Sequence, residues 1–248
     1  MAEKVKFDDK RASVLAEYVE MMKGLYGEEL VSLNLFGEGA VEPPGQGGHH
    51  IKMLAVMTAV GPAQLGRYAS VSAKWQKKGI PPPLMLTAEM LETSTDVFPM
   101  EFLEMKDAYV LLYGRDVLAG LEIGLDNLRR EIEEQVKGKL IHLQQAYMEA
   151  GGDKKALSGL ISSSVEPFCE IMRNAIRLKE DGAPVHKEPI IKQFCKGFGL
   201  DEAPFLEALG IRRLGLMPSR DELDALYARY LGEVTRMVEK IDKFTSSV

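Results

Sequence analysis

The sequence has few cysteines and no excess of basic charge. Its two cysteines, Cys169 and Cys195, form no Cys-x-x-Cys pair, and each lies in a helical pattern. We therefore expect buried free thiols in a reducing compartment. The formal net charge of the 248 residues is −6. This acidity makes the chain a poor candidate for nucleic-acid binding, because such binding depends on basic patches.

Long apolar runs are also missing. No run approaches the roughly 18 residues that a membrane-spanning helix needs, and the charged segment Met1–Lys10 lacks the apolar core of a signal peptide. These absences predict a cytoplasmic protein of bacterial type with no membrane partner. A hydrophobic content of 46% is ordinary for a globular chain and sufficient for a real core.

The first half of the sequence mixes helix and strand patterns. Apolar residues at helical spacing predict a helix over 8–26, and alternation predicts a strand over 30–36. Further strands are expected over 51–58, 84–86, 96–105 and 109–113. Helices are expected over 62–78 and 88–93. Residues 37–48 contain so much glycine and proline that no regular structure is expected there.

The second half shows only helical patterns. They cover 126–150, with Asp126 as the cap, then 153–178, 188–197, 202–209 and a long final helix. Pro167 should kink or divide the second of these helices. Ser219 and Glu222 form a capping box before the last one. The predicted fold class is therefore α+β, with a mixed sheet flanked by helices over 1–122 and an all-α helical domain over 123–248.

The strand, Gly-rich loop and strand at 30–58 carry the most information. Leu33-Asn-Leu-Phe-Gly-Glu-Gly-Ala40, followed by His50-Ile-Lys-Met-Leu-Ala-Val56, resembles the minimal nucleotidyltransferase family of the DNA polymerase β superfamily. In that family a strand ends in Gly-Ser, and Asp-x-Asp follows at the next apolar strand. Here Gly37-Glu38 stands at the Gly-Ser position, and His50-Ile51-Lys52 stands at the Asp-x-Asp position.

Two later segments extend the resemblance. Glu101-Phe-Leu-Glu104 lies where the family has the strand that bears its third carboxylate, and Glu101 is the expected carboxylate. Val110-Leu-Leu-Tyr-Gly-Arg-Asp116 resembles the Leu-Tyr-Gly-x-Asp strand that often closes this fold. The resemblance covers residues 10–150 and implies a nucleotidyltransferase-like fold.

Three departures from the family pattern oppose the family's reaction. Nucleotidyl transfer in this fold uses two Mg²⁺ ions held by anionic oxygen ligands. An Asp-x-Asp strand presents both carboxylates on one face, whereas this sequence offers the imidazole of His50 and the ammonium of Lys52. Glu38 adds a carboxylate that repels a triphosphate. We therefore expect a catalytically inactive protein without a metal or other cofactor. The loop could still hold a nucleotide through Gly37, Glu38, Gly39 and Lys52.

Three functions remain open on this interpretation. The first is a nucleotidyltransferase-like pseudoenzyme that acts as a binding or interaction module, with a nucleotide or a protein as its partner. The second is an active Mg²⁺-dependent nucleotidyltransferase whose carboxylates come from Glu38, Glu42 and Glu101 or Glu104. The third is a structural protein whose helical half forms a homo-oligomer or a partner interface.

Simpler interpretations apply to the same residues. The stretch 37–48 is a long connection between two strands if the resemblance is set aside. His49 and His50 are adjacent on an extended segment and face opposite ways, so they are not expected to share a metal ion.

Overall fold

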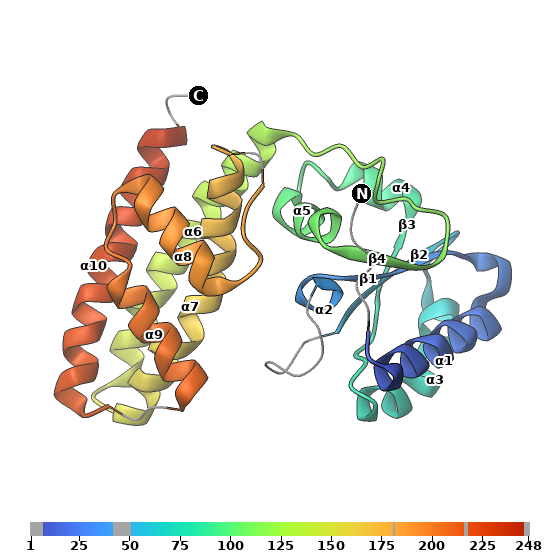
Figure 1. The fold of residues 1–248 in the computed structure, drawn as a ribbon, viewed down its shortest axis with the longest axis horizontal. Coiled ribbons are helices and arrows are strands. Elements are labelled where there is room, and N and C mark those ends of the chain that lie inside the picture. The colour runs from blue at the N-terminus through green and yellow to red at the C-terminus, as the bar shows by residue number, and fades with distance from the viewer. Residues whose placement is uncertain (1–6, 42–50, 181, 216–217, 246–248) are drawn as a thin grey trace. The chain divides into compact units, whose positions relative to one another are not determined.

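The protein divides into two compact units, Met1–Gly124 and Leu125–Val248, which are described separately (Figure 1). The computed structural model describes residues 7–41, 51–180, 182–215 and 218–245. The fold class is α+β. A mixed sheet with helices forms the first unit, and the described part of the second unit contains helices and no strand.

One four-stranded sheet organises the described residues of the first unit, in the order β3-β2-β1-β4. The strands are β1 (Leu30–Phe36), β2 (Lys52–Met57), β3 (Leu84–Thr87) and β4 (Tyr109–Gly114). β1 pairs antiparallel with β2 and β4, and β2 pairs parallel with β3. The central strands β1 and β2 are therefore the two that flank the Gly-rich loop in the sequence.

Local signals set the ends of the helices in the first unit. These are α1 (Asp9–Tyr26), η1 (Gly27–Glu29), α2 (Glu38–Val41), α3 (Pro62–Lys77), α4 (Ala88–Thr93) and α5 (Pro99–Asp107). The Asp8 side chain caps α1 by accepting from the N–H of Arg11, and Thr87 caps α4 by accepting from the N–H of Met90. Pro62 begins α3, where its missing N–H removes no helical hydrogen bond.

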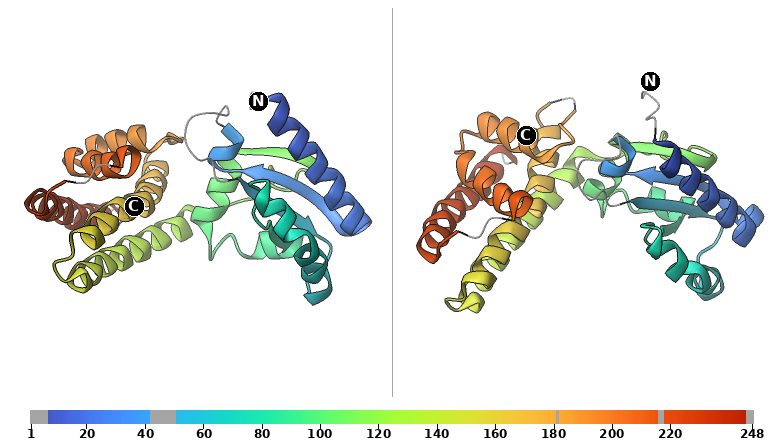
Figure 2. Two further views of the ribbon diagram at one scale, coloured as in Figure 1. Left: turned by 90° about the horizontal axis from the view of Figure 1, so that it is seen from below. Right: turned by 60° about the horizontal axis from the view of Figure 1, so that its bottom comes forward.

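Apolar side chains cover both faces of the sheet. On one face Leu35 packs under α1 and α3, which lie side by side (Figures 1 and 2). Tyr18 of α1 and Trp75 of α3 meet there edge to face, with ring centroids 4.9 Å apart. On the other face Leu54 packs against Phe102 of α5. The central strands β1 and β2 are thus buried between two layers, whereas β4 is only partly buried.

Two segments of the first unit differ from the sequence predictions. The predicted strand over 96–105 is wrong, because most of this segment is helix α5. Pro99 takes the first helical position, which it favours, and Phe102 and Met105 lie one turn apart on the face toward the sheet. Residues 38–41 form the short helix α2, although their glycine-rich context predicts no regular structure.

The second unit consists of packed helices. They are α6 (Leu125–Ala150), α7 (Lys154–Arg177), α8 (Lys187–Phe198), α9 (Ala203–Leu214) and α10 (Arg220–Thr245). α7 packs against α6, α8, α9 and α10. It runs through Pro167 as one helix, so of the two predicted effects, a kink or a division, the division is wrong. Packing against four helices outweighs the hydrogen bond that proline removes.

The ends of the long helices test two predicted caps. Ser219 and Glu222 form the predicted capping box, in which each residue's N–H donates to the other's side chain. The sequence predicts Asp126 as the cap of α6, but this residue lies inside the first turn. A carboxylate still suits that position, because it faces the positive end of the helix dipole.

The two cysteines are free and buried, as predicted. Burial raises the pKa of the Cys195 thiol to about 12, which keeps this thiol protonated and unreactive at neutral pH. Within the described ranges, no helix combines the length and apolar character needed to cross a membrane.

Candidate functional site

An ion pair joins the beginning of β2 to helix α5. Lys52 and Phe36 are register partners on β2 and β1. The Lys52 Nζ lies 2.9 Å from Glu104 Oε1, and the two side chains are 44% and 26% exposed. Gly37 follows β1 directly and lies against both side chains. We call Gly37, Lys52 and Glu104 the corner site.

Glycine is required at position 37 for two reasons. Its φ of +75° lies in the left-handed region, which favours glycine. A Cβ at this position would lie 3.2 Å from Glu104 Oε1 and 3.6 Å from Lys52 Cδ. A side chain at position 37 would therefore crowd the ion pair as well as strain the turn.

The backbone of the turn after β1 is hydrogen-bonded within the protein. The Gly37 N–H donates to the Ala108 carbonyl at 2.8 Å, and the Gly37 carbonyl accepts from the Ala40 N–H at 2.8 Å. The Gly39 carbonyl accepts from Arg11 Nη2 at 2.7 Å. The N–H of Gly37 is therefore not directed at a ligand, although such loops often use this group to bind phosphate.

Arg11 connects the start of α1 to this turn. Its guanidinium is half-buried and lies over the Phe7 ring, 5.0 Å from the centroid. Burial lowers the pKa of Arg11, and the nearby Asp8 carboxylate acts in the opposite direction. Sequence reasoning missed this residue, because its partner is the backbone carbonyl of Gly39. Every residue has such a carbonyl, so the sequence does not indicate which one Arg11 binds.

The structure brings some of the predicted site residues together. Gly37 and Lys52 meet in the corner site, and the carboxylate that contacts Lys52 belongs to Glu104. Glu101 is exposed in the first turn of α5, and Glu38 is the first residue of helix α2. His50, which the sequence analysis pairs with Lys52, lies outside the described residues, as does Glu42.

Among the described residues, the corner site brings only one carboxylate close to Lys52. In this ion pair, the ammonium of Lys52 and the carboxylate of Glu104 carry opposite charges. Across the described chain, no three His, Cys, Asp or Glu side chains are grouped so that they could hold a metal ion. The arrangement can fix α5 against β2, and no second carboxylate stands beside Glu104 in this site among the residues that the structure describes.

The Leu-Tyr-Gly-x-Asp segment holds the chain in place after β4. The Tyr109 hydroxyl donates to both carboxylate oxygens of Asp116, at 3.0 and 2.8 Å, and the Ala119 N–H donates to Asp116 Oδ1 at 3.1 Å. Burial, followed by the hydrogen bond to Asp116, raises the pKa of Tyr109 to about 12. Gly114 has a φ of +84°, and a Cβ there would lie 2.1 Å from the Val31 carbonyl oxygen. Tyr109, Gly114 and Asp116 therefore have structural roles in the first unit.

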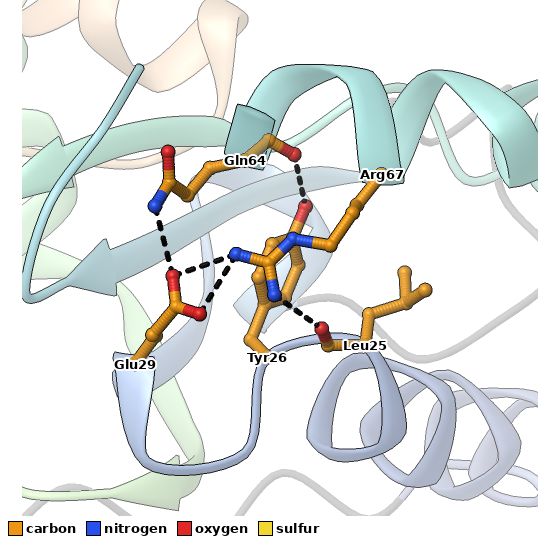
Figure 3. Close-up of polar contacts among 5 residues, drawn as sticks. All are labelled: Leu25, Tyr26, Glu29, Gln64 and Arg67. Carbon is orange, nitrogen blue, oxygen red and sulfur yellow. Dashed lines mark hydrogen bonds and ion pairs between the residues drawn. The ribbon is translucent and has the colours of Figure 1, made fainter. Parts of the chain in front are cut away.

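A second polar cluster joins α1, η1 and α3 (Figure 3). Arg67 donates to both carboxylate oxygens of Glu29, at 2.8 and 2.6 Å, and to the Leu25 carbonyl at 2.9 Å. Gln64 donates to Glu29, and the Tyr26 hydroxyl donates to the Gln64 carbonyl, each at 2.9 Å. The hydrogen bond from Arg67 lowers the pKa of Glu29. The groups bond to one another, so the cluster links three elements and presents no ligand site.

No protein-family model matches the sequence, and no curated protein matches it. The mixed four-stranded sheet, the helical unit that follows and the geometry of the corner site are therefore the basis for a functional proposal.

Proposed function

We propose that the first unit is a nucleotidyltransferase-like domain that has lost metal-dependent nucleotidyl transfer, and that the chain acts as a binding or interaction module. The observation that carries the proposal is the 2.9 Å ion pair between Lys52 and Glu104 beside Gly37. The strand pairing supports it. β1 ends at Phe36, next to Gly37, and pairs antiparallel with β2, which begins at Lys52. On this strand pair the resemblance places Gly-Ser and Asp-x-Asp.

The charges of the corner site oppose a catalytic metal. Two like unit charges 4 Å apart repel by about 4 kcal/mol at the effective dielectric of a protein surface. A divalent ion near the Lys52 ammonium would meet such repulsion, reduced by solvent because Lys52 is half-exposed. The ion would also have to take Glu104 from Lys52. In this proposal the lysine ammonium satisfies the carboxylate that would otherwise bind metal.

The hydrogen bonds of the turn also oppose phosphate binding. The Gly37 N–H is bonded to Ala108, and the Lys52 ammonium is bonded to Glu104. A triphosphate would have to break both contacts while approaching the carboxylate of Glu104. We therefore expect the corner site to bind neither nucleotide nor Mg²⁺, and we propose a protein as the partner of the module.

Thermal unfolding and turnover test this proposal together. The full chain is titrated with each NTP, with and without Mg²⁺, while unfolding and pyrophosphate release are measured. We expect no Mg²⁺-dependent shift and no turnover. Turnover that disappears in Glu101→Ala or Glu104→Ala, but persists in the control Glu92→Ala on α4, would establish an active enzyme. A shift with NTP alone would show that nucleotide binding has survived.

A further inference from the structure

Exposed apolar side chains gather in one short stretch of the first unit. Leu84, Met90, Val97 and Phe98 are 43%, 53%, 58% and 49% exposed. They lie on β3, on α4 and on the segment that leads into α5. We call this stretch the 84–98 surface. Single exposed apolar residues are common, whereas apolar residues grouped on a surface indicate a binding site, and these four all lie within residues 84–98.

The local structure holds these side chains outside the core. Leu91 of α4 is buried in the layer against the sheet, while the adjacent Met90 faces outward. The N–H groups of Val97 and Phe98 both donate to the Ser94 carbonyl, at 3.1 and 3.0 Å. The turn is therefore closed by its own hydrogen bonds, and its apolar side chains remain exposed in the folded unit.

Strand β3 adds an open edge to the same surface. It stands at one end of the strand order and pairs with β2, so its other edge has no neighbouring strand among the described residues. Leu84 begins this strand. Edge strands present unpaired backbone groups, which binding partners often use or cover.

The charged residues within this part of the sequence are all acidic. From Gly79 to Met105 the sequence has no Lys, Arg or His and has five carboxylates. One of these, Glu104, is paired with Lys52. The other four are exposed and form no ion pair with another residue that the structure describes; they are Glu89, Glu92, Asp96 and Glu101. The 84–98 surface thus combines exposed apolar side chains with exposed carboxylates from the same part of the chain, and such carboxylates repel nucleic acids and anionic lipids.

We propose that the 84–98 surface docks a basic amphipathic helix of a partner protein. The apolar face of that helix would cover Met90, Val97 and Phe98, and its Lys and Arg residues would meet the four carboxylates. A second copy of this chain fits less well, because each copy carries a net charge of −6. The inference rests on the proposed role as an interaction module and gives that role a surface and a class of partner.

A synthetic peptide provides the probe. It has about 18 residues, or five helical turns, with leucine on one face and lysine on the other, and its binding to the full chain is measured by titration calorimetry. We expect Val97→Ser/Phe98→Ser to weaken binding by about tenfold or more. Glu89→Lys/Glu92→Lys should weaken it as well and reduce its dependence on salt. The control Leu65→Ser, at another exposed apolar position, should leave binding unchanged.

Three results would overturn the inference. These are no binding of the lysine peptide, equal binding of a peptide with glutamate in place of lysine, or an affinity that the two surface variants leave unchanged.

Sedimentation analysis tests the alternative that a second copy of this chain occupies the surface. Self-association that Val97→Ser/Phe98→Ser removes would assign the surface to a second copy instead of a basic partner. Mg²⁺-dependent turnover would overturn the proposed loss of catalysis without any change in peptide binding, so the two failures are distinguishable.

Discussion

Replacing Gly114 by alanine tests whether the Leu-Tyr-Gly-x-Asp segment serves the fold. The added Cβ would lie 2.1 Å from the Val31 carbonyl oxygen and 2.9 Å from its carbon, at a φ of +84°. A non-glycine residue in the left-handed region costs about 1–2 kcal/mol, and forcing extra volume into packed structure costs about 1–3 kcal/mol. We expect the first unit to lose about 2–5 kcal/mol of its free energy of unfolding, a large share of the about 5–15 kcal/mol that is typical of a domain.

Urea unfolding followed by tryptophan fluorescence measures this loss. Trp75 is the single tryptophan of the chain and is fully buried in the first unit, so its emission reports on that unit. Gly120→Ala is the matched control, because a Cβ there meets no atom within 4 Å and its φ is not positive. The control should change stability by less than about 0.5 kcal/mol. Equal urea midpoints for Gly114→Ala and the wild type would refute the structural role.

Two further predictions concern buried or bonded polar groups of the first unit. Arg67 lowers the folded-state pKa of Glu29 below its unfolded-state value near 4.5. The bond between the two residues therefore stabilises the folded unit fully above pH 4.5, and this stabilisation is lost as pH falls through the lower folded-state pKa. The Trp75 unfolding midpoint should therefore fall less steeply with acid in Glu29→Gln, and identical acid profiles would contradict this. Asn34 is fully buried, so Asn34→Asp should destabilise the unit strongly at neutral pH and less at acid pH, where the carboxyl is protonated; a pH-independent loss would exclude that cause.

The two central strands could be predicted from the sequence, because their apolar residues follow patterns that are typical of strands. Leu33 and Leu35 alternate on β1, and the apolar run after Lys52 marks β2 as a buried strand. The segment that leads into α5 resembles a buried strand in the sequence, because Val97, Phe98, Pro99 and Met100 form a short apolar run. The position of Pro99 fits the first turn of a helix equally well. Short apolar segments that satisfy both periods are decided by packing against the rest of the fold.

Packing also determines which carboxylate reaches Lys52. The order of strand, loop and strand could be predicted from the sequence, and it places Gly37 close to Lys52. The choice of Glu104 over Glu101 depends on the orientation of α5, which local sequence does not specify. The bond from Arg11 to the Gly39 carbonyl depends likewise on long-range folding. Sequence reasoning therefore identifies the region of the corner site more readily than its contacts.

Restoring the aspartates tests the central claim most directly. If Lys52 occupies a lost metal position, His50→Asp/Lys52→Asp replaces the ammonium beside Glu104 with a carboxylate and adds a second carboxylate two residues earlier in the sequence. His50→Asn/Lys52→Asn is the matched control, because it has nearly the same shape without the charge. Titration calorimetry with Mn²⁺ should show binding to the aspartate variant and none to the asparagine variant or the wild type. Metal binding by the wild type, or its absence in a folded aspartate variant, would contradict the claim.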